Sequence, residues 1–433
     1  MKALLELVRR HRGGEAIGIY SVCSAHPLAL RAALEHARAT DNYALIEATS
    51  NQVNQEGGYT GLRPAQFRDL VLGLADESGL PRERVLLGGD HLGPNAWQAM
   101  PADEALVRAG VMVDEYVRAG YRKIHLDCSM SCLGDPRALG DEIVAERTAA
   151  LCARTEEAWR QSGGEPPVYI IGTEVPVPGG AQEDLHELAV TEPRAALATV
   201  TAHRSAFVTN GLRSAWERVI GLVVQPGVEF GHDRVIDYRP DKARHLSKCL
   251  EDLPNLVFEA HSTDYQTESA LRALVRDHFA ILKVGPAVTF ALREAVWALD
   301  SIEREWRGES ASANVRATIL QAMRADPRHW RKYYHETGTR LDLQLQYSLS
   351  DRIRYYWPEP AVVAALERLR TAFKDREPPP ALLSQYLPAA YASVRSGTIP
   401  ARMTDLVIHH IRQVLSCYSR ACAPLTPEEG TVS

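Results

Sequence analysis

Eight short apolar segments, rich in β-branched residues, are spread along the first two thirds of the chain. They cover residues 16–22, 43–49, 84–90, 123–129, 168–174, 219–225, 255–261 and 279–285. Apolar runs of this length are typical of strands that are buried on both faces, as in parallel sheets. Longer segments of helical period separate them, among them 64–79 and 101–120, which begin at Pro and end at Gly as helices often do. The alternation predicts repeated βα units.

The number of predicted strands is the number that a TIM (β/α)8 barrel requires, although a doubly wound sheet is a structural alternative. We favour the barrel because polar residues follow almost every predicted strand, and in barrels the carboxyl ends of the strands carry the chemistry. The alternation stops near residue 300, and the rest of the chain is helical and aromatic-rich, with a Pro-rich segment at 376–383. We therefore predict a barrel over residues 1–300 and a helical C-terminal subdomain or cap over residues 301–433.

The composition excludes several classes of protein. With 45% hydrophobic and 24% charged residues, the chain resembles an ordinary soluble protein, and its net charge of -6 argues against nucleic acids and anionic membranes as partners. No apolar run reaches about 18 residues, so no membrane span is predicted. The segment MKALLELVRRHRGG lacks the apolar core of a signal peptide and is expected to begin a first helix. Seven scattered cysteines without a CxxC pair favour reduced thiols and a cytoplasmic location.

Chemically versatile side chains stand where three alternate strands end. Asp90 and His91 end the third predicted strand, Glu174 ends the fifth, and His261 ends the seventh. Two imidazoles and a carboxylate at one face of a barrel have the composition of a catalytic zinc or manganese site with an open position. A single His at a strand end is more often structural, so the hypothesis depends on the set. We predict that His91, Glu174 and His261 bind a divalent metal ion.

Other polar residues near the strand ends allow two interpretations. His26, before a Pro, and His125, within the fourth strand, are assigned structural roles. Asp127 either positions a substrate or caps the following turn. Residues 47–54 either face a ligand or satisfy their own backbone in a turn. Lys283 either forms a Schiff base, as in some barrel aldolases, or an ion pair with a carboxylate.

A phosphate group would need backbone amides or fixed cations. The Gly-rich segments 57–61 and 177–180 and the pair Ser262–Thr263 could supply amides. Arg352 and Arg354 could clamp a phosphate, or could stack on neighbouring tyrosines. The sequence contains neither GxxxxGK[ST] nor a Rossmann fingerprint after its first strand, which disfavours nucleotide binding.

Several longer motifs together resemble the Z-type (GatZ/KbaZ) family associated with tagatose-bisphosphate aldolase. They are EATSNQVNQ, GGDHLGPN, KIHLDCSMSC, GTEVPVPGG, VVQPGVEF, EAHSTDYQT, DHFAILKVGPA and SLSDRIRYYWP. The resemblance runs from SVCSAHP to the C-terminal helices, over nearly the whole chain. It implies a class II aldolase-like TIM barrel, a divalent metal ion (Zn²⁺ or Mn²⁺) and a phosphorylated ketohexose as substrate.

Members of this family are described in two ways, and both stay open here. Some resemble a non-catalytic subunit that stabilises a class II D-tagatose-1,6-bisphosphate aldolase, which would make a Y-type aldolase subunit the partner. Others resemble 4-epimerases that interconvert D-tagatose 6-phosphate and D-fructose 6-phosphate in galactitol and tagatose catabolism. Compared with catalytic class II aldolases, Asp90 is similar to their catalytic Asp, and His91 and His261 to zinc ligands. Glu174 stands where they have His, although two His and one Glu also form a zinc site.

The chemistry of a 4-epimerase suits these residues. C4 of a 2-ketohexose is β to the carbonyl, so enolisation cannot invert it, whereas cleavage and re-formation of the C3–C4 bond can. Such a reaction needs a Lewis acid and proton-transfer groups on both faces. We expect Asp90 to move the C4 hydroxyl proton and Glu259 or Asp127 to act on the other face. The expected substrate and phosphate contacts are Asn51, Gln52, Ser262, Thr263, Lys283, Arg352 and Arg354.

We favour an active epimerase because all three predicted metal positions bear plausible ligands. The accessory role is the alternative, and a sugar-phosphate kinase is disfavoured because no segment is suited to hold ATP. We also expect the chain to form a homo-oligomer.

Overall fold

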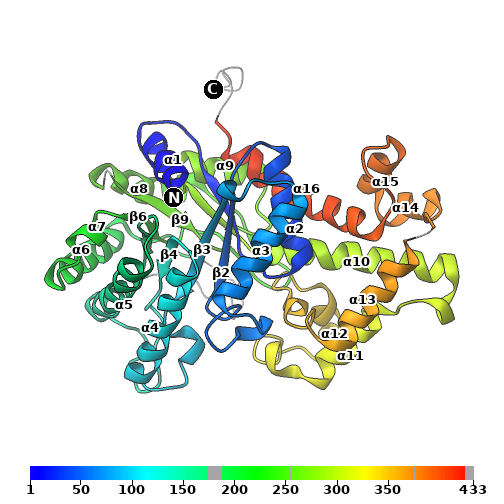
Figure 1. Ribbon diagram of the computed structural model, residues 1–433, viewed down its shortest axis with the longest axis horizontal. Helices are drawn as coiled ribbons and strands as arrows, with labels where there is room; N and C mark the ends of the chain where they lie inside the picture. The colour runs from blue at the N-terminus through cyan, green and yellow to red at the C-terminus, as the bar shows by residue number, and fades with distance from the viewer. Residues whose placement is uncertain (174–187, 254, 375, 425–433) are drawn as a thin grey trace.

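The computed structural model describes residues 1–173, 188–253, 255–374 and 376–424. Eight parallel strands close into a barrel in the order β1-β10-β9-β6-β5-β4-β3-β2 (Figure 1). They are β1 (Ile19–Val22), β2 (Ala44–Thr49), β3 (Val85–Leu92), β4 (Lys123–Leu126), β5 (Val168–Ile171), β6 (Val219–Val223), β9 (Val257–Ala260) and β10 (Ile281–Val284). Every predicted segment overlaps one of these strands, and only β3 extends beyond its predicted segment, to Leu92. The predicted TIM barrel is therefore confirmed, and the doubly wound sheet is excluded.

Helices connect successive strands and cover the outside of the barrel. They are α2 (Pro27–Ala39), α3 (Pro64–Ser78), α4 (Ala102–Arg118), α5 (Asp141–Ser162), α6 (Pro193–Thr209), α7 (Arg213–Trp216), α8 (Pro240–Cys249) and α9 (Glu268–Arg276). Four of them begin with Pro in the first turn, where its missing N–H leaves no helical hydrogen bond unmade. A small antiparallel pair, β7 (Glu229–Phe230) and β8 (Val235–Ile236), follows β6.

The interior of the barrel is apolar at its amino end and charged above it. Helix α1 (Lys2–Arg12) closes the amino end, where Leu4 and Val8 pack with Leu45 of β2 and Ile281 of β10. Side chains of a strand alternate between its two faces, so the residue two positions later points to the same side. These inward positions are Ser21, Glu47, Lys123, Glu259 and Lys283, all of them buried. The barrel therefore contains a layer of charge directly beneath its carboxyl end.

A glycine on β3 makes room for one of these charges. A Cβ atom added to Gly88 would lie 2.7 Å from Cγ of Glu47. That distance is shorter than a non-bonded carbon contact, so a side chain at position 88 would displace the Glu47 carboxylate.

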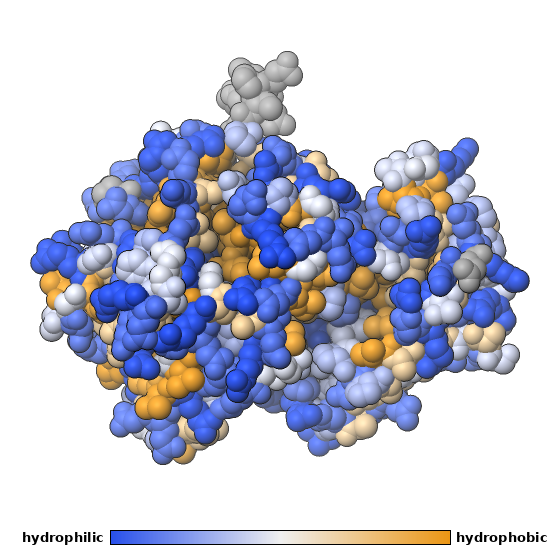
Figure 2. Space-filling view, viewed as in Figure 1, coloured by the Kyte–Doolittle hydropathy of each residue, from blue (hydrophilic) through white to orange (hydrophobic). Residues whose placement is uncertain are grey.

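The C-terminal region is helical, as predicted. Helix α10 (Pro286–Arg307) starts at the end of β10 and extends away from the barrel (Figure 1). It is followed by α11 (Val315–Ala325), α12 (Gly338–Tyr347), α13 (Pro360–Ala372), α14 (Pro380–Tyr386) and α15 (Pro388–Arg395). Hydrophilic residues cover most of the face shown in Figure 2. In the described ranges, no helix is both long and apolar enough to cross a membrane.

The last helix returns to the barrel. Helix α16 (Met403–Cys422) packs against α2, α9 and β1, and the carbonyl of Cys422 accepts a hydrogen bond of 3.0 Å from the backbone N–H of Gly18. It thereby fills the outer layer between α9 and α2. The division of the chain at residue 300 stays a prediction, but this helix belongs to the barrel's outer layer by its contacts.

Candidate functional site

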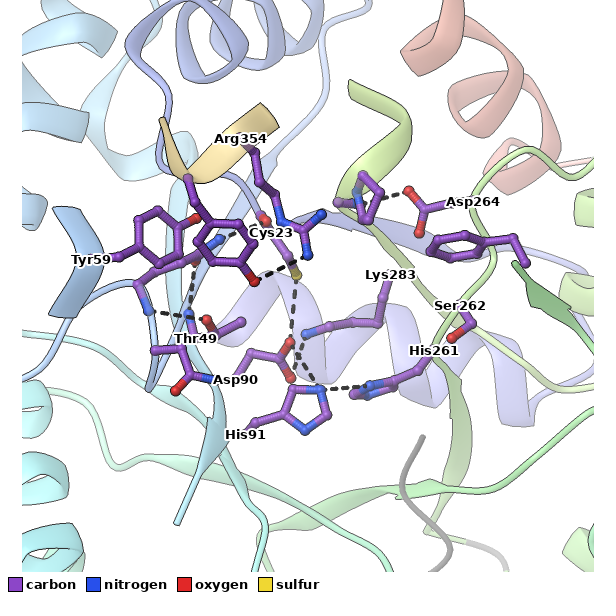
Figure 3. Close-up of a pocket in the computed structure, with 16 residues that line it drawn as sticks. Cys23, Thr49, Tyr59, Asp90, His91, His261, Ser262, Asp264, Lys283 and Arg354 are labelled. Atoms are coloured by element: carbon purple, nitrogen blue, oxygen red, sulfur yellow. Dashed lines mark hydrogen bonds and ion pairs between the residues drawn. The ribbon is translucent and has the colours of Figure 1, made fainter. Parts of the chain in front are cut away.

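A pocket opens at the carboxyl end of the barrel (Figure 3). The pocket brings together most of the predicted site residues, from four strands and from the C-terminal region. Those that line it are Asn51, Gln52, Asp90, His91, His261, Ser262, Lys283 and Arg354.

Three imidazoles gather at the floor of this pocket. Their ring centroids lie 4.8 Å apart for His91 and His261, 5.1 Å for His91 and His125, and 5.2 Å for His125 and His261. His91 has a left-handed backbone with φ of 48°, which is uncommon outside glycine. Three strands therefore direct imidazoles toward one point: β3, β4 and the end of β9.

The hydrogen bonds of two imidazoles leave their lone pairs facing each other. Nδ1 of His91 lies 2.8 Å from Oδ2 of Asp127, and Nε2 of His261 lies 3.0 Å from Oε1 of Glu259. A carboxylate only accepts, so each of these nitrogens carries the proton. The other two nitrogens, Nε2 of His91 and Nδ1 of His261, are 3.2 Å apart. Two lone pairs at this distance repel unless a proton or a cation lies between them.

The third imidazole, His125, has a buried nitrogen without a partner. Its Nδ1 lies 2.9 Å from Oδ1 of Asp90, whereas its buried Nε2 has no hydrogen-bond partner. Ligand atoms of Asp90, His125, Glu259 and His261 all lie within 4.8 Å of one another, so this buried group could hold a metal ion. The separation of His91 and His261 also fits, because a tetrahedral zinc ion holds ligand nitrogens about 3.3 Å apart.

A network of buried ion pairs supports the floor of the pocket. Nζ of Lys123 lies 2.8 Å from Glu47 and 2.6 Å from Glu259. Nζ of Lys283 lies 2.9 Å from Glu47 and 3.0 Å from Asp90. Of the two interpretations of Lys283, a Schiff base or an ion pair, these contacts support the ion pair. Although burial lowers its pKa, the carboxylate of Asp90 and its other neighbours raise the pKa of Lys283 well above the ordinary value, so the amine is a poor nucleophile.

The charges of this buried cluster do not balance. Four carboxylates face two ammonium groups: Glu47, Asp90, Asp127 and Glu259 against Lys123 and Lys283. With neutral imidazoles, the excess of two negative charges equals the charge of a divalent cation. Uncompensated charge is strongly disfavoured inside a protein. The charge of the cluster therefore also fits a divalent ion.

The pKa values of Asp90, Glu259 and His261 agree with these protonation states, whereas the pKa of His91 shifts in the other direction. Burial alone would raise the pKa of Asp90 and Glu259, but lysines and imidazoles hold both pKa values well below the ordinary range. Burial lowers the pKa of His261 to about 4, so this imidazole is neutral near pH 7. Burial also lowers the pKa of His91, but Asp90 and Asp127 outweigh it, so the net shift is upward.

The opposite wall of the pocket comes from other segments. Arg354 and Tyr355 belong to the short helix η7 (Arg352–Tyr355), and Tyr59 to η1 (Gly58–Thr60). Figure 3 shows the Arg354 guanidinium above Asp90 and Lys283. Asp264 accepts hydrogen bonds of 2.9 and 2.8 Å from the N–H groups of Gly285 and Ala287, at the start of α10, and burial raises its pKa to about 6.

Several predicted residues do not line the pocket. Asp127 is buried against His91 and Ser129, and Glu259 lies within the charged layer, so neither side chain reaches the pocket as an acid/base. The hydroxyl of Thr263 donates to the carbonyl of Lys283. Arg352 is buried, and its guanidinium lies 3.3 Å from the ring centroid of Tyr333. It therefore stacks on a tyrosine, which is the second of the two roles that the sequence allowed. Glu174 and the segment 177–180 lie outside the described residues.

The structure gives one of the two histidines that were assigned structural roles a different place. His125 was assigned a structural role, but it belongs to the group that could hold a metal. Its signal was its spacing, because it lies two positions after Lys123 and so faces the same interior. His26 keeps its structural role, since its Nδ1 accepts from the N–H of Leu28 at the start of α2.

The model of one protein family matches residues 4–423 of this chain. Its description is D-tagatose-1,6-bisphosphate aldolase subunit GatZ/KbaZ-like. The chain belongs to this family. The match covers both the barrel and the C-terminal helices, so the family relationship includes the walls of the pocket as well as its floor.

One crystal structure is similar to this chain over nearly its whole length. It is that of a probable tagatose 6 phosphate kinase from Sinorhizobium meliloti 1021, with 48% identity, a TM-score of 0.86, and coverage of 94% of this chain and 100% of that chain. More distant matches include the fructose-bisphosphate aldolase from Campylobacter jejuni, at 14% identity and a TM-score of 0.43 over 86% of this chain and 92% of that chain. A match at this level does not bear on function.

Proposed function

We propose that this chain is a metal-dependent epimerase that inverts C4 of a ketohexose 6-phosphate, interconverting D-tagatose 6-phosphate and D-fructose 6-phosphate. The observation that carries the proposal is the pair of imidazole nitrogens, Nε2 of His91 and Nδ1 of His261, that face each other 3.2 Å apart beside an open pocket. The neighbouring carboxylates and the His125 nitrogen without a partner support it.

The imidazoles of His91, His125 and His261 would hold the ion, with Asp90 or Glu259 beside them. The predicted ligand set of His91, Glu174 and His261 is thus revised by the addition of His125, and Glu174 stays a prediction. A bound divalent ion would polarise the ketose oxygens and stabilise the negative charge that develops there. Asp127 and Glu259 each hold one imidazole in the tautomer that a ligand needs.

Asp90 is suited to take the proton of the C4 hydroxyl. It lines the pocket, and its carboxylate stays ionised because Lys283 and the imidazoles surround it. As the proton leaves, the C3–C4 bond breaks and C4 becomes an aldehyde. The aldehyde turns over, and the bond re-forms on its other face. The outcome is inversion at C4 with no net change in composition.

Arg354 is suited to bind the phosphate. Its guanidinium faces the pocket from the wall opposite Asp90, and Asn51, Gln52 and Ser262 line the same pocket. A phosphate held there would keep the aldehyde fragment in the pocket while it turns. Lys283 already neutralises Asp90 and Glu47, so we assign it to the charged floor rather than to the phosphate.

The decisive experiment uses the purified chain without any partner. Supplied with Zn²⁺ or Mn²⁺ and D-tagatose 6-phosphate, it should form D-fructose 6-phosphate, and a chelator should abolish the reaction. The variants His125→Ala and His261→Ala should lose both the activity and the metal measured by elemental analysis. Full metal content in both variants would refute the ligand assignment.

The description of the family as an aldolase subunit supports a second candidate function, an accessory role. Turnover only when a class II aldolase is added would favour this role and contradict the epimerase. The name of the Sinorhizobium meliloti relative makes a kinase a further outcome of the same assay. Consumption of ATP with tagatose 6-phosphate would support the kinase, whereas the epimerase reaction needs no nucleotide.

A further inference from the structure

Inversion through an aldehyde needs proton transfer at two places. The C4 oxygen points to opposite sides in the two epimers, so the group that takes its proton from one epimer cannot serve the other. Asp90 can serve one side, but Asp127 and Glu259 do not line the pocket. A second proton-transfer group must come from elsewhere in the pocket wall. This inference rests on the proposed function.

Tyr355 has the position and the contacts of such a group. It lines the same pocket as Asp90, on the wall that carries Arg354. Its hydroxyl oxygen lies 3.2 Å from Nη2 of Arg354 and 3.4 Å from Nη1 of Arg352. Both guanidinium groups donate to this oxygen, and neither can accept its proton. The phenol is therefore stabilised as an anion, and its proton is not held by these neighbours.

The ring of Tyr355 is fixed from two sides. Tyr59 meets it edge to face with ring centroids 4.7 Å apart, and His329 of η6 (Pro327–His329) stacks on it at 4.9 Å with an angle of 4° between the planes. Aromatic contacts of this kind hold a ring in one orientation. The hydroxyl is therefore held in one orientation beside the pocket.

We propose that Tyr355 is the second proton-transfer residue of the epimerase, acting on the C4 oxygen from the side opposite Asp90. In one direction, Asp90 takes the C4 hydroxyl proton while the C3–C4 electron pair moves to C2–C3 as an enediolate. After the aldehyde turns, C3 attacks its other face, and the new C4 alkoxide takes the proton of Tyr355. Asp90 then releases its proton to solvent and Tyr355 regains one. The reverse reaction uses the same two groups in exchanged roles.

The charges around Tyr355 suit this role. Burial would raise its pKa, but Arg354 and Arg352 outweigh burial and lower the pKa of the phenol below its ordinary value. Further groups that face it are Lys332, His329 and Tyr59. Burial lowers the pKa of His329, so this imidazole is neutral near pH 7. A lower phenol pKa brings its proton exchange closer to neutral pH, where it assists catalysis most.

The test is the variant Tyr355→Phe, which keeps the ring and removes the hydroxyl. We expect kcat to fall about 10²–10⁴-fold with KM changed only a few-fold. The wild-type pH profile of kcat/KM should show the same alkaline limb from this phenol in both reaction directions, because the two enzyme forms that start the two directions carry the same number of protons. This limb should vanish in the variant. Tyrosinate absorbance should show one tyrosine ionising below about pH 10 in the wild type and not in the variant.

Tyr333→Phe is the matched control, because it removes a hydroxyl from the ring beneath Arg352 but does not line the pocket. It should retain normal kinetics. If Tyr355 only contacted phosphate, the variant would instead raise KM and keep its pH profile, which would overturn the proposed role. No turnover by the wild-type chain would refute the proposed function itself. Normal wild-type turnover with an unaffected Tyr355→Phe variant would refute the role of Tyr355 alone.

Discussion

His91 illustrates how a single residue links backbone conformation to chemistry. Its φ of 48° is a conformation that side chains other than glycine rarely adopt, and it persists only where the surroundings hold it. The Asp127 carboxylate accepts from its Nδ1 at 2.8 Å, and its backbone nitrogen lies 3.2 Å from Nδ1 of His125. Together these contacts turn Nε2 of His91 toward His261. Asp127 thus acts through His91, as a positioning residue.

At the residue scale, we predict that Asp127→Asn weakens metal binding. An amide can donate as well as accept, so His91 loses the partner that holds the proton on Nδ1. Loss of such a partner lowers metal affinity about 10–100-fold. Titration of the apoprotein with Zn²⁺ against a chromophoric chelator measures the change. The control is Ser129→Ala, which removes only the hydroxyl that donates to Asp127 at 2.6 Å. Equal affinities for Asp127→Asn and the wild type would contradict this role.

The contacts of α1 show how a single element is attached to the barrel. The buried imidazole of His11 lies in the last turn of α1. Its Nδ1 donates to the carbonyl of Ile17 at 2.7 Å, and its Nε2 lies 3.0 Å from Nδ1 of His278. Nε2 of neutral His11 accepts from Nδ1–H of His278, so this contact needs His11 uncharged. Burial lowers the pKa of His11 to about 4. The attachment of α1 therefore depends on pH.

At the element scale, we predict that His11 destabilises the fold in mild acid. Unfolded His11 takes up its proton near pH 6.5, whereas folded His11 does so only near pH 4. Stability is therefore lost as the pH falls through this window, by about 2 kcal/mol at pH 5 relative to pH 7.5. Denaturant unfolding of wild type and His11→Gln at both pH values should show a smaller pH effect in the variant. His245→Gln changes an exposed imidazole and should keep the wild-type pH effect.

Helix α16 connects the C-terminal region to the barrel, since it comes last in the chain but lies between α2 and α9. Its Tyr418 hydroxyl donates to the carbonyl of Thr263, in the loop that follows β9, at 2.7 Å. That loop also contains Ser262 and Asp264, which line the pocket. The C-terminal region therefore supports the pocket twice, through α16 beneath the loop after β9 and through η7 in the opposite wall.

At the scale of the whole molecule, we predict that Leu415→Ala lowers the stability of barrel and C-terminal region together. Leu415 is fully buried in the main core, and its truncation typically costs about 2–5 kcal/mol. Because α16 packs on the barrel, calorimetry should show one transition that shifts as a unit. The exposed neighbour Gln413→Ala should change stability by less than about 0.5 kcal/mol. A separate C-terminal transition that alone responds to Leu415→Ala would contradict this coupling.

Local sequence determined the strands, the helices between them and the residues at the strand ends. Asp90, His91 and His261 lie in one pocket because a closed parallel barrel brings all its carboxyl ends to one face, whatever the details of packing. Apolar runs and Pro or Gly at helix ends are local signals, so they could be recognised without knowledge of the tertiary fold.

Only the tertiary structure decided which side chains reach the pocket from within strands and from distant segments. His125 lies beneath the pocket, against His91 and His261, because of the orientation and register of β4, and Arg354 faces the pocket while Arg352, two residues earlier, stacks on Tyr333. Tyr355 meets Tyr59 although nearly 300 residues separate them in the sequence. Such contacts depend on how α10 to α16 fold back over the barrel. Packing between distant segments leaves no periodic signal in the sequence, because it is set by the shapes of both surfaces together.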